Sequence, residues 1–223
     1  MLFRSAAGVA AKNLATGTHA SAGVPTAYSM NSGYYAGEFA AKFAKANPYP
    51  DLPRDAIRKL AEHAMSPLNR PKRGPTSDVL HDELCKLESS VVETMRLNGD
   101  KLTHMLARAK DVKEQALSAH ASSLHDLAKL HEAGNIAEAG EAIYSSALDR
   151  TESREQFYRE DYPDTDDANW FVWHGVTKSQ DGTKFEKLEI PLDGPLKPKG
   201  MRPKHPSPIA AIMAGNYDHR AYD

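Results

Sequence analysis

Apolar residues recur at helical spacing in three successive runs between residues 76 and 149, and this pattern constrains the fold most strongly. Each run places its apolar residues on one stripe and its polar residues on the other faces of a helix. The three stripes are Leu80, Leu84, Leu87, Val91 and Met95; Leu102, Leu106, Ala109, Val112 and Ala116; and Leu124, Leu127, Leu130, Ile136, Ala139, Ile143 and Ala147. Because the connections between the runs are short, we predict an antiparallel three-helix bundle.

Residues that favour helix ends separate the three runs. They are Thr76 or Ser77 before the first run, Asn98-Gly99 and Asp100 between the first and the second, and Ser122 or Ser123 before the third. Gly134 and Gly140 interrupt the third run, and each lowers helix propensity by about 1 kcal/mol. We therefore expect these glycines to let another helix approach closely.

The residues before the bundle have a different pattern. Residues 1–33 are rich in small residues, which predicts a short strand or coil followed by loops around Gly17, Gly23 and Pro25. Gly33 then opens a predicted helix from Tyr34 to Ala46, and a shorter helix follows from Pro53 to Met65. Residues 66–75, with the sequence SPLNRPKRGP, form a basic, proline-rich linker.

After the bundle the pattern changes from helix to strand. Residues 171–177 and 184–192 alternate between apolar and polar, with a turn signal at Gln180-Asp181-Gly182, so we predict a β-hairpin. The proline-rich residues 193–223 are expected to form an extended tail. Its segment from Ile209 to Met213 is apolar enough to dock on a partner, with disorder as the alternative.

Composition excludes several classes of protein. A formal net charge of −2 gives no reason to expect nucleic acid as a partner, and no apolar run approaches the ~20 residues of a membrane span. Cys85 is the only cysteine, so it forms no internal disulfide, and its spacing with Leu84 and Leu87 predicts a buried structural thiol. The histidines at 120, 125 and 131 do not share a helix face, so no metal site is expected.

The segment from Arg150 to Trp170, RTESREQFYREDYPDTDDANW, combines charges of both signs with aromatic residues at high density. Such a composition suits charges that are partly buried and paired with one another. The alternative is a solvated helix end that runs into a loop.

This segment closely resembles the one that follows the helical domain in flavoproteins of the fumarate reductase, succinate dehydrogenase, L-aspartate oxidase and adenylylsulfate reductase superfamily. The matching positions are Arg150, Glu152, Ser153, Arg154, Arg159, Asp161, Tyr162, Pro163, Asp166, Asp167, Asn169 and Trp170. The chain departs from the superfamily at Glu155, where Gly is usual, and at Phe157, where the quinol-linked members usually have His. The resemblance implies that Arg154, Arg159 and Asp161 clamp the helical domain onto a flavin domain.

A second, shorter resemblance lies near the N-terminus. The residues Ala6-Ala7-Gly8, His19-Ala20, Asn31-Ser32-Gly33 and Ala36-Gly37-x-x-Ala40-Ala41 look like the last FAD-binding block of the same superfamily. The resemblance implies a loop from His19 to Gly33 that cradles the flavin, and a helix whose N-terminus stabilises the reduced anion. The implied cofactor-binding residues are Gly8, His19, Ala20, Ser29, Met30, Asn31 and Ser32.

Two departures in this block bear on the branch of the superfamily. Val9 stands where an acidic residue normally contacts the ribose on the adenosine side of FAD, and no arginine lies between Arg4 and Arg54. Fumarate reductases carry an arginine in this region that holds a substrate carboxylate. A dicarboxylate substrate is therefore disfavoured, and the adenylylsulfate reductase branch is favoured.

Taken together, the resemblance implies a mainly α chain: a loop-plus-helix remnant of an FAD-binding domain (1–65), a linker (66–75), a helical bundle domain (76–170), a β-hairpin (171–192) and an extended tail (193–223). The chain lacks the GxGxxG motif that holds the FAD pyrophosphate. It therefore resembles the C-terminal portion of an FAD-dependent oxidoreductase, whose implied partners are the remainder of the flavoprotein and an iron–sulfur protein subunit. The catalytic residues and the substrate stay open.

The alternative is a non-catalytic helical subunit of a larger complex. The N-terminal residues 1–25 contain Arg4 and Lys12, many small and hydroxyl residues, and no acidic residue, which is the composition of an organelle transit peptide. On that interpretation the protein lies in the mitochondrial matrix. On the flavoprotein interpretation it is cytoplasmic, and residues 1–33 contact the flavin.

Overall fold

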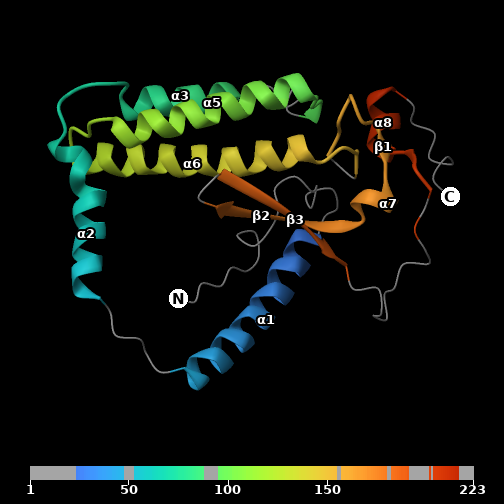
Figure 1. The fold of residues 1–223 in the computed structure, drawn as a ribbon, viewed down its shortest axis with the longest axis horizontal. Coiled ribbons are helices and arrows are strands. Elements are labelled where there is room, and N and C mark those ends of the chain that lie inside the picture. Colours follow the sequence, from blue (N-terminus) through green and yellow to red (C-terminus); the bar gives the residue numbers. More distant parts are fainter. Residues whose placement is uncertain are drawn as a thin grey trace. The chain divides into compact units, whose positions relative to one another are not determined.

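The computed structural model describes residues 24–47, 53–87, 95–154, 157–179, 182–190, 201 and 203–215. The chain divides into two compact units, residues 1–63 and 64–223. In chain order the elements are α1 (Val24–Ala46), α2 (Arg54–Met65), the 3-10 helix η2 (Ser66–Asn69), α3 (Ser77–Leu87), α5 (Gly99–Ser118), α6 (Leu124–Asp149), β1 (Asp164–Thr165), α7 (Asp167–Trp170), β2 (Val172–Ser179), β3 (Gly182–Glu189), β4 (His205–Pro206) and α8 (Pro208–Met213) (Figure 1). The fold is mainly helical with a small antiparallel hairpin, as predicted.

Helices α5 and α6 form the closest helix pair of the second unit (Figure 1). A Cβ placed on Gly134 would lie 3.6 Å from the Cβ of Ala116, and one placed on Gly140 would lie 3.6 Å from the Cβ of Ala109. From the first of these contacts to the second, the residue number decreases along α5 and increases along α6, so the two helices are antiparallel. Both glycines therefore allow the close approach that the sequence predicted.

Helix α3 completes the bundle. The hydroxyl of Ser77 donates to the carboxylate of Asp126, and a ring nitrogen of His81 lies 3.1 Å from the carbonyl oxygen of Lys129. These contacts advance along α3 and α6 together, so the two helices run parallel and α3 is antiparallel to α5. The predicted three-helix arrangement is confirmed for the described residues; Val91, from the first predicted stripe, lies outside them.

The predicted start of the third helix agrees with the structure, whereas Asn98, which was predicted to end the first helix, caps the second one. Asn98 caps α5, where its side-chain oxygen accepts a hydrogen bond from Lys101 N at 3.0 Å. Ser123 caps α6 in the same way, with Asp126 N as the donor at 3.1 Å. Each cap satisfies a backbone N–H that has no partner within the first turn of its helix.

The apolar core lies between these three helices. Its buried members are Leu80, Leu84, Val112, Ala116, Ala119, Ala121, Leu127, Leu130, Ala133 and Ala137. The predicted stripe on α6 is wrong at Leu124, Ile136 and Ala139, which are exposed, while Ala133 and Ala137 are buried. Small side chains are needed on this face because α5 approaches so closely, and the larger Ile136 is turned outward.

Cys85 is exposed, which corrects the prediction of a buried thiol. Leu84 faces the core, and the next residue along a helix lies about 100° further around the axis. That rotation places Cys85 on the outer side of α3.

In the first unit, α1 begins at Val24, ten residues before the predicted start at Tyr34. The expected loop between Gly23 and Gly33 is therefore wrong for the described residues. Pro25 lies in the first turn, where the missing N–H of proline has no helical partner to lose. Gly33 and Gly37 are accommodated inside the helix rather than ending it.

The predicted linker at residues 66–75 contains a folded part. Within it, η2 buries Pro67, whose carbonyl oxygen accepts from the backbone N–H of Ala121 at 3.0 Å. Arg70 Nη1 donates to the carbonyl oxygen of Ala119 at 3.0 Å. These contacts pack the beginning of the second unit against the connection between α5 and α6.

The C-terminal part of the chain is more ordered than predicted. Strands β2 and β3 pair from Val172↔Glu189 to Ser179↔Gly182, which confirms the hairpin. The tail is not simply extended, because β4 pairs antiparallel with β1 and α8 follows it. Ile209 is buried, so the apolar tail segment packs on its own chain. No helix among the described residues is long and apolar enough to cross a membrane.

Candidate functional site

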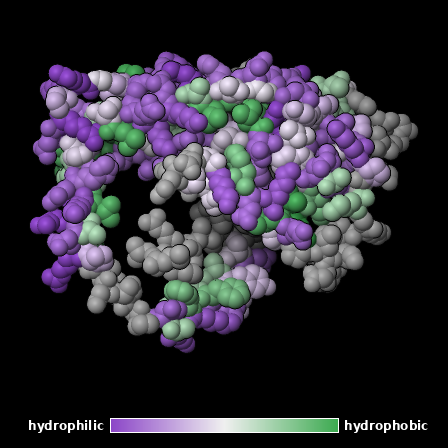
Figure 2. All heavy atoms as spheres, in the orientation of Figure 1, coloured by the Kyte–Doolittle hydropathy of each residue, from purple (hydrophilic) through white to green (hydrophobic). Residues whose placement is uncertain are grey.

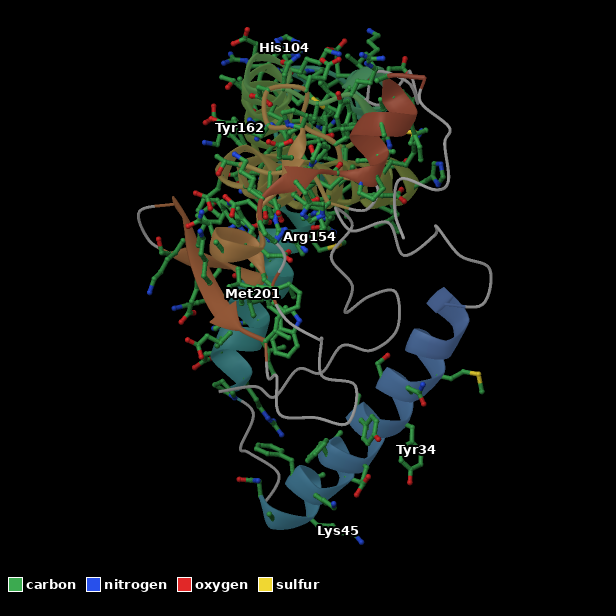
Figure 3. All side chains as sticks on the ribbon, turned by 90° about the vertical axis from the view of Figure 1, so that its right-hand side faces the viewer. Tyr34, Lys45, His104, Arg154, Tyr162 and Met201 are labelled. Atoms are coloured by element: carbon green, nitrogen blue, oxygen red, sulfur yellow. The ribbon has the colours of Figure 1, made fainter. Side chains whose placement is uncertain are left out.

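The connection between α6 and β2 holds a network of charged side chains at one end of the bundle, where Figure 3 labels Arg154 and Tyr162. Glu152 is 0% exposed and Arg159 is 2% exposed. Buried charges are stable only when they are paired and hydrogen-bonded. The partners of these two residues therefore decide the structure of the whole connection.

Glu152 is the centre of the first half of the network. Its Oε1 accepts hydrogen bonds from Arg150 Nη1 at 2.7 Å and from Arg154 Nε at 2.9 Å. Its Oε2 accepts from Arg154 Nη2 at 2.9 Å and from the backbone N–H of Asp166 at 2.8 Å. Arg154 Nη2 also donates to Asp167 Oδ1 at 2.8 Å. Four donors thus satisfy a carboxylate that has no contact with solvent.

Arg159 is the centre of the second half and joins the ends of two helices. Its Nη1 donates to the carbonyl oxygens of Ala147 at 2.7 Å and Arg150 at 3.1 Å, at the C-terminal end of α6. Its Nε and Nη2 donate to the two carboxylate oxygens of Asp161, both at 2.7 Å. Asp161 Oδ2 accepts from the backbone N–H of Gly99, at the N-terminus of α5, at 2.9 Å. A cation therefore lies at a helix C-terminus and an anion at a helix N-terminus, as the two helix dipoles favour.

The Arg159–Asp161 pair also affects acid–base behaviour. The hydrogen bond from Arg159, assisted by that from the backbone of Gly99, holds the pKa of Asp161 below its ordinary value, although burial opposes this with an effect second only to that of the Arg159 bond. Asp161 is therefore charged at neutral pH.

Ser153 organises the backbone between the two halves. Its hydroxyl accepts from Arg159 N and donates to the carbonyl oxygen of Tyr162, both at 2.8 Å. Its carbonyl oxygen accepts from the hydroxyl of Thr165 at 2.8 Å, and its N–H donates to Asp164 O at 2.9 Å. These bonds fix the loop so that Glu152 and Arg159 can both be buried.

Trp170 lies near the end of the connection between α6 and β2, and its ring contacts two cations. The Arg150 guanidinium lies 5.2 Å from its ring centroid, and Lys187 Nζ lies 3.6 Å from the same centroid. The indole N–H donates to Thr151 Oγ1 at 3.0 Å. Because Lys187 lies on β3, this cation–π contact joins the hairpin to Trp170 and so to the network.

The prediction that these charges are paired is confirmed. In the described part of the chain, the hydrogen-bond and ion-pair partners of Arg154, Arg159 and Asp161 all lie within residues 64–223. Within this unit the cluster fastens helix ends together, and a contact of the same cluster with a flavin domain stays a prediction. Phe157, at the position where quinol-linked members have His, is buried and supplies no acid–base group.

The predicted flavin residues have a different setting from the expected one. Gly8, His19 and Ala20 lie outside the described residues. Ser29, Met30, Asn31 and Ser32 lie inside α1, where backbone N–H groups bond within the helix instead of pointing at a ligand. The expected loop over these four residues is thus a helix, and the assignment of the predicted residues to FAD stays a prediction.

The sequence did not predict one cluster of side chains that the structure brings together. His174 on β2 lies against Ser146 and Asp149 of α6. These residues are 28 and 25 positions apart along the chain, and neither a motif nor a periodicity connects them. Only the position of the hairpin on the bundle brings them together.

Comparison with known proteins identifies this arrangement. Solved structures with the same fold include adenylylsulfate reductase from Archaeoglobus fulgidus, with a TM-score of 0.63 and 21% identity over 73% of this chain and 29% of that one. Others are quinol fumarate reductase from E. coli, with a TM-score of 0.59 and 17% identity over 78% and 31% of the two chains, and Mycobacterium smegmatis Sdh1, with a TM-score of 0.58 and 22% identity over 80% and 29%. The chain thus matches less than a third of the length of each relative. No curated protein matches the sequence.

A family model described as fumarate reductase flavoprotein C-term matches residues 83–206. The match covers more than half of the chain and includes α5, α6, the charged network and the hairpin. Flavoproteins of this family are FAD-dependent. The chain belongs to the family of fumarate reductase flavoprotein C-terminal domains.

Proposed function

We propose that this chain works as the C-terminal portion of an FAD-dependent oxidoreductase. It supplies the helical domain, and it depends on an FAD-binding part that carries the GxGxxG phosphate loop absent from these 223 residues. The observation that carries the proposal is the family match across the charged network from Arg150 to Trp170. The contribution of this chain is binding and positioning, because the ionisable groups of that network are engaged with one another.

The surface of α1 supports a macromolecular partner for the first unit. Hydrophobic residues gather along α1 in Figure 2, whereas much of the visible outer face of the second unit is hydrophilic. Tyr34, which points away from the ribbon in Figure 3, is 71% exposed, and Phe39 is 63% exposed. Clustered exposed aromatic side chains of this size mark interaction sites. The remainder of the flavoprotein is the partner we propose for this helix.

The finer assignment is an enzyme nearer to adenylylsulfate reductase than to the dicarboxylate enzymes. Two features support it: the absence of an arginine between Arg4 and Arg54, and the buried Phe157 in place of the usual His. We propose an iron–sulfur protein subunit as the electron-transfer partner of the assembled enzyme, and the cytoplasm as its location. Sequencing the N-terminus of the native protein tests the location, since a mature start near residue 25 would indicate a removed transit peptide instead.

Co-expression tests the main proposal. The full chain is produced with a tag, together with a candidate FAD-binding protein encoded beside it, and the complex is purified through the tag. We expect the visible absorption of flavin to accompany the complex and to be missing from the chain alone. A chain that purifies without any flavin-binding protein, from its native source as well as from co-expression, would contradict the proposal.

A further inference from the structure

His174 connects the β-hairpin to the last turn of α6. Its Nδ1 lies 3.0 Å from the hydroxyl oxygen of Ser146, and its Nε2 lies 3.0 Å from Asp149 Oδ2. Ser146 and Asp149 are three residues apart, so they project from the same face of the helix. The side chain of His174 is 3% exposed. One imidazole of the hairpin is thus held between two polar groups of the bundle.

Aromatic rings enclose the other sides of this imidazole. Phe185 on β3 stacks against it with ring centroids 5.2 Å apart and planes inclined by 26°. Trp170 meets it edge to face, with centroids 5.5 Å apart. The ring therefore belongs to the contact surface between the hairpin, α7 and α6, and its charge state affects that whole contact.

Ser146, His174 and Asp149 are the residue types of a hydrolase triad, but their setting does not suit nucleophilic catalysis. Ser146 is only 7% exposed, and its hydroxyl faces the imidazole within the packed contact. A substrate carbonyl would have to approach that oxygen directly. The group is better suited to respond to protons than to attack a substrate.

Charges from three directions act on His174. Asp149 at the end of α6 favours the imidazolium, whereas Arg150 after α6 and Lys187 on β3 oppose it. Burial is the largest influence, and together these effects place the pKa of His174 below its ordinary value. The neutral ring fits this environment, and a second positive charge beside Arg150 and Lys187 does not.

We propose that neutral His174 holds the β2–β3 hairpin on α6 and that protonation of His174 loosens the hairpin, so that this contact is a pH-sensitive clasp. The proposal is independent of flavin binding, because it depends only on residues of the second unit. The Lys187 contact with Trp170 lies on the same hairpin, so loosening the clasp also exposes Trp170 and weakens the end of the charged network.

The direction of the pH effect follows from linkage. The unfolded or detached state binds a proton at the ordinary histidine pKa of about 6.5, while the docked state binds it only at lower pH. Docking is therefore fully stable above about pH 6.5 and weakens as the pH falls toward the pKa of docked His174. Within that window the opening equilibrium rises by up to about tenfold for each pH unit.

Hydrogen exchange on the full chain tests the clasp. Protection factors of hairpin amides, corrected for intrinsic exchange rates, are compared between about pH 7.5 and about pH 5.5, where linkage predicts the two states. We expect a loss of protection in the hairpin at the lower pH and unchanged protection in α5. The emission of Trp170 and Trp173, the only two tryptophans, should shift to the red over the same range.

Three variants separate the clasp from general acid sensitivity. His174→Gln should abolish the pH dependence of hairpin protection, and the matched control His104→Gln, at an exposed histidine of α5, should retain it. Asp149→Asn removes the charge that favours the imidazolium, so the pKa of docked His174 falls further and the acid-induced loss of hairpin protection should be at least as large as in wild type. This variant keeps the test decisive if His174→Gln does not fold. Hairpin protection that is constant with pH in the wild type, or an equal pH dependence in His174→Gln, would overturn the proposal. A smaller acid-induced loss of protection in Asp149→Asn than in wild type would also overturn it.

Discussion

At the scale of single residues, Glu152 is a charged side chain in a fully buried position. It is completely buried and accepts hydrogen bonds from Arg150, Arg154 and the backbone of Asp166. Removing one member of such a group leaves the remaining charges buried without compensation, which is more damaging than never having had the pair. The stability of the connection between α6 and β2 therefore depends strongly on this one carboxylate.

The substitution Glu152→Gln tests that dependence. We expect it to reduce the free energy of unfolding by about 3 kcal/mol, because the partly buried Arg150 loses the carboxylate that it bonds and Arg154 keeps only Asp167. Urea denaturation followed by circular dichroism measures the change. Glu114→Gln at an exposed position of α5 is the matched control and should change stability by less than about 0.5 kcal/mol. Equal stability of the two variants would refute a central role for Glu152.

At the scale of elements, helix ends and helix faces control the bundle. Arg159 closes the C-terminus of α6 while its partner Asp161 closes the N-terminus of α5, so a single ion pair fastens both helices. On the facing surfaces, glycine and alanine set the distance between α5 and α6. The two kinds of contact are independent, since the ion pair acts through charge at the helix ends and the glycine and alanine contacts act through side-chain volume along the helices.

The pH dependence of stability tests the role of the Arg159–Asp161 ion pair at the helix ends. The pKa of Asp161 is lowered chiefly by the hydrogen bond from Arg159, so its contribution to stability is complete above its unfolded pKa of about 3.9. As the pH falls through the lower folded pKa, that contribution disappears. Asp161→Asn should therefore be less stable than wild type at neutral pH and should lose less further stability in acid. Parallel curves of unfolding free energy against pH for the two proteins would contradict this assignment.

Substitutions at Gly134 test the packing of the helix faces. A methyl group there would meet the Cβ of Ala116 at 3.6 Å, an ordinary van der Waals distance. Gly134→Ala should therefore stabilise the protein by about 0.5–1 kcal/mol through its higher helix propensity. Gly134→Leu, in contrast, should destabilise it by about 1–3 kcal/mol, because the added carbons overpack the contact with α5. Thermal unfolding distinguishes the two variants. Destabilisation by Gly134→Ala would contradict the prediction, because it would show that the added methyl group does not fit against Ala116.

At the scale of the whole molecule, the two units differ in how completely they bury their apolar residues. The second unit encloses its core between three helices and adds the hairpin and the tail. In the first unit, α1 exposes large aromatic residues, including Tyr34 and Phe39. Among the described residues of this unit none covers that face of α1, and exposed aromatic side chains of this kind are typical of a surface that binds a partner.

Binding measurements with the proposed flavoprotein partner test this difference. The double substitution Tyr34→Ser and Phe39→Ser should weaken the complex by at least about tenfold, as expected when two aromatic anchors are removed from an interface. Leu117→Ser, at a position of α5 that is 61% exposed, is the matched control and should leave the affinity unchanged. Unfolding of the second unit should be the same in all three proteins. An affinity that is lost only with Leu117→Ser would move the interface to the bundle.

The sequence by itself determined the local features: three helices, the cap at Ser123, the hairpin, and the family to which the charged motif belongs. These follow from hydrogen bonds and periodicities between residues that are close along the chain. Only the tertiary structure decided which face of α6 is buried, where the tail packs, and that His174 meets Ser146 and Asp149. Such contacts join segments that are far apart in sequence, and they depend on how the elements pack, which local patterns do not specify.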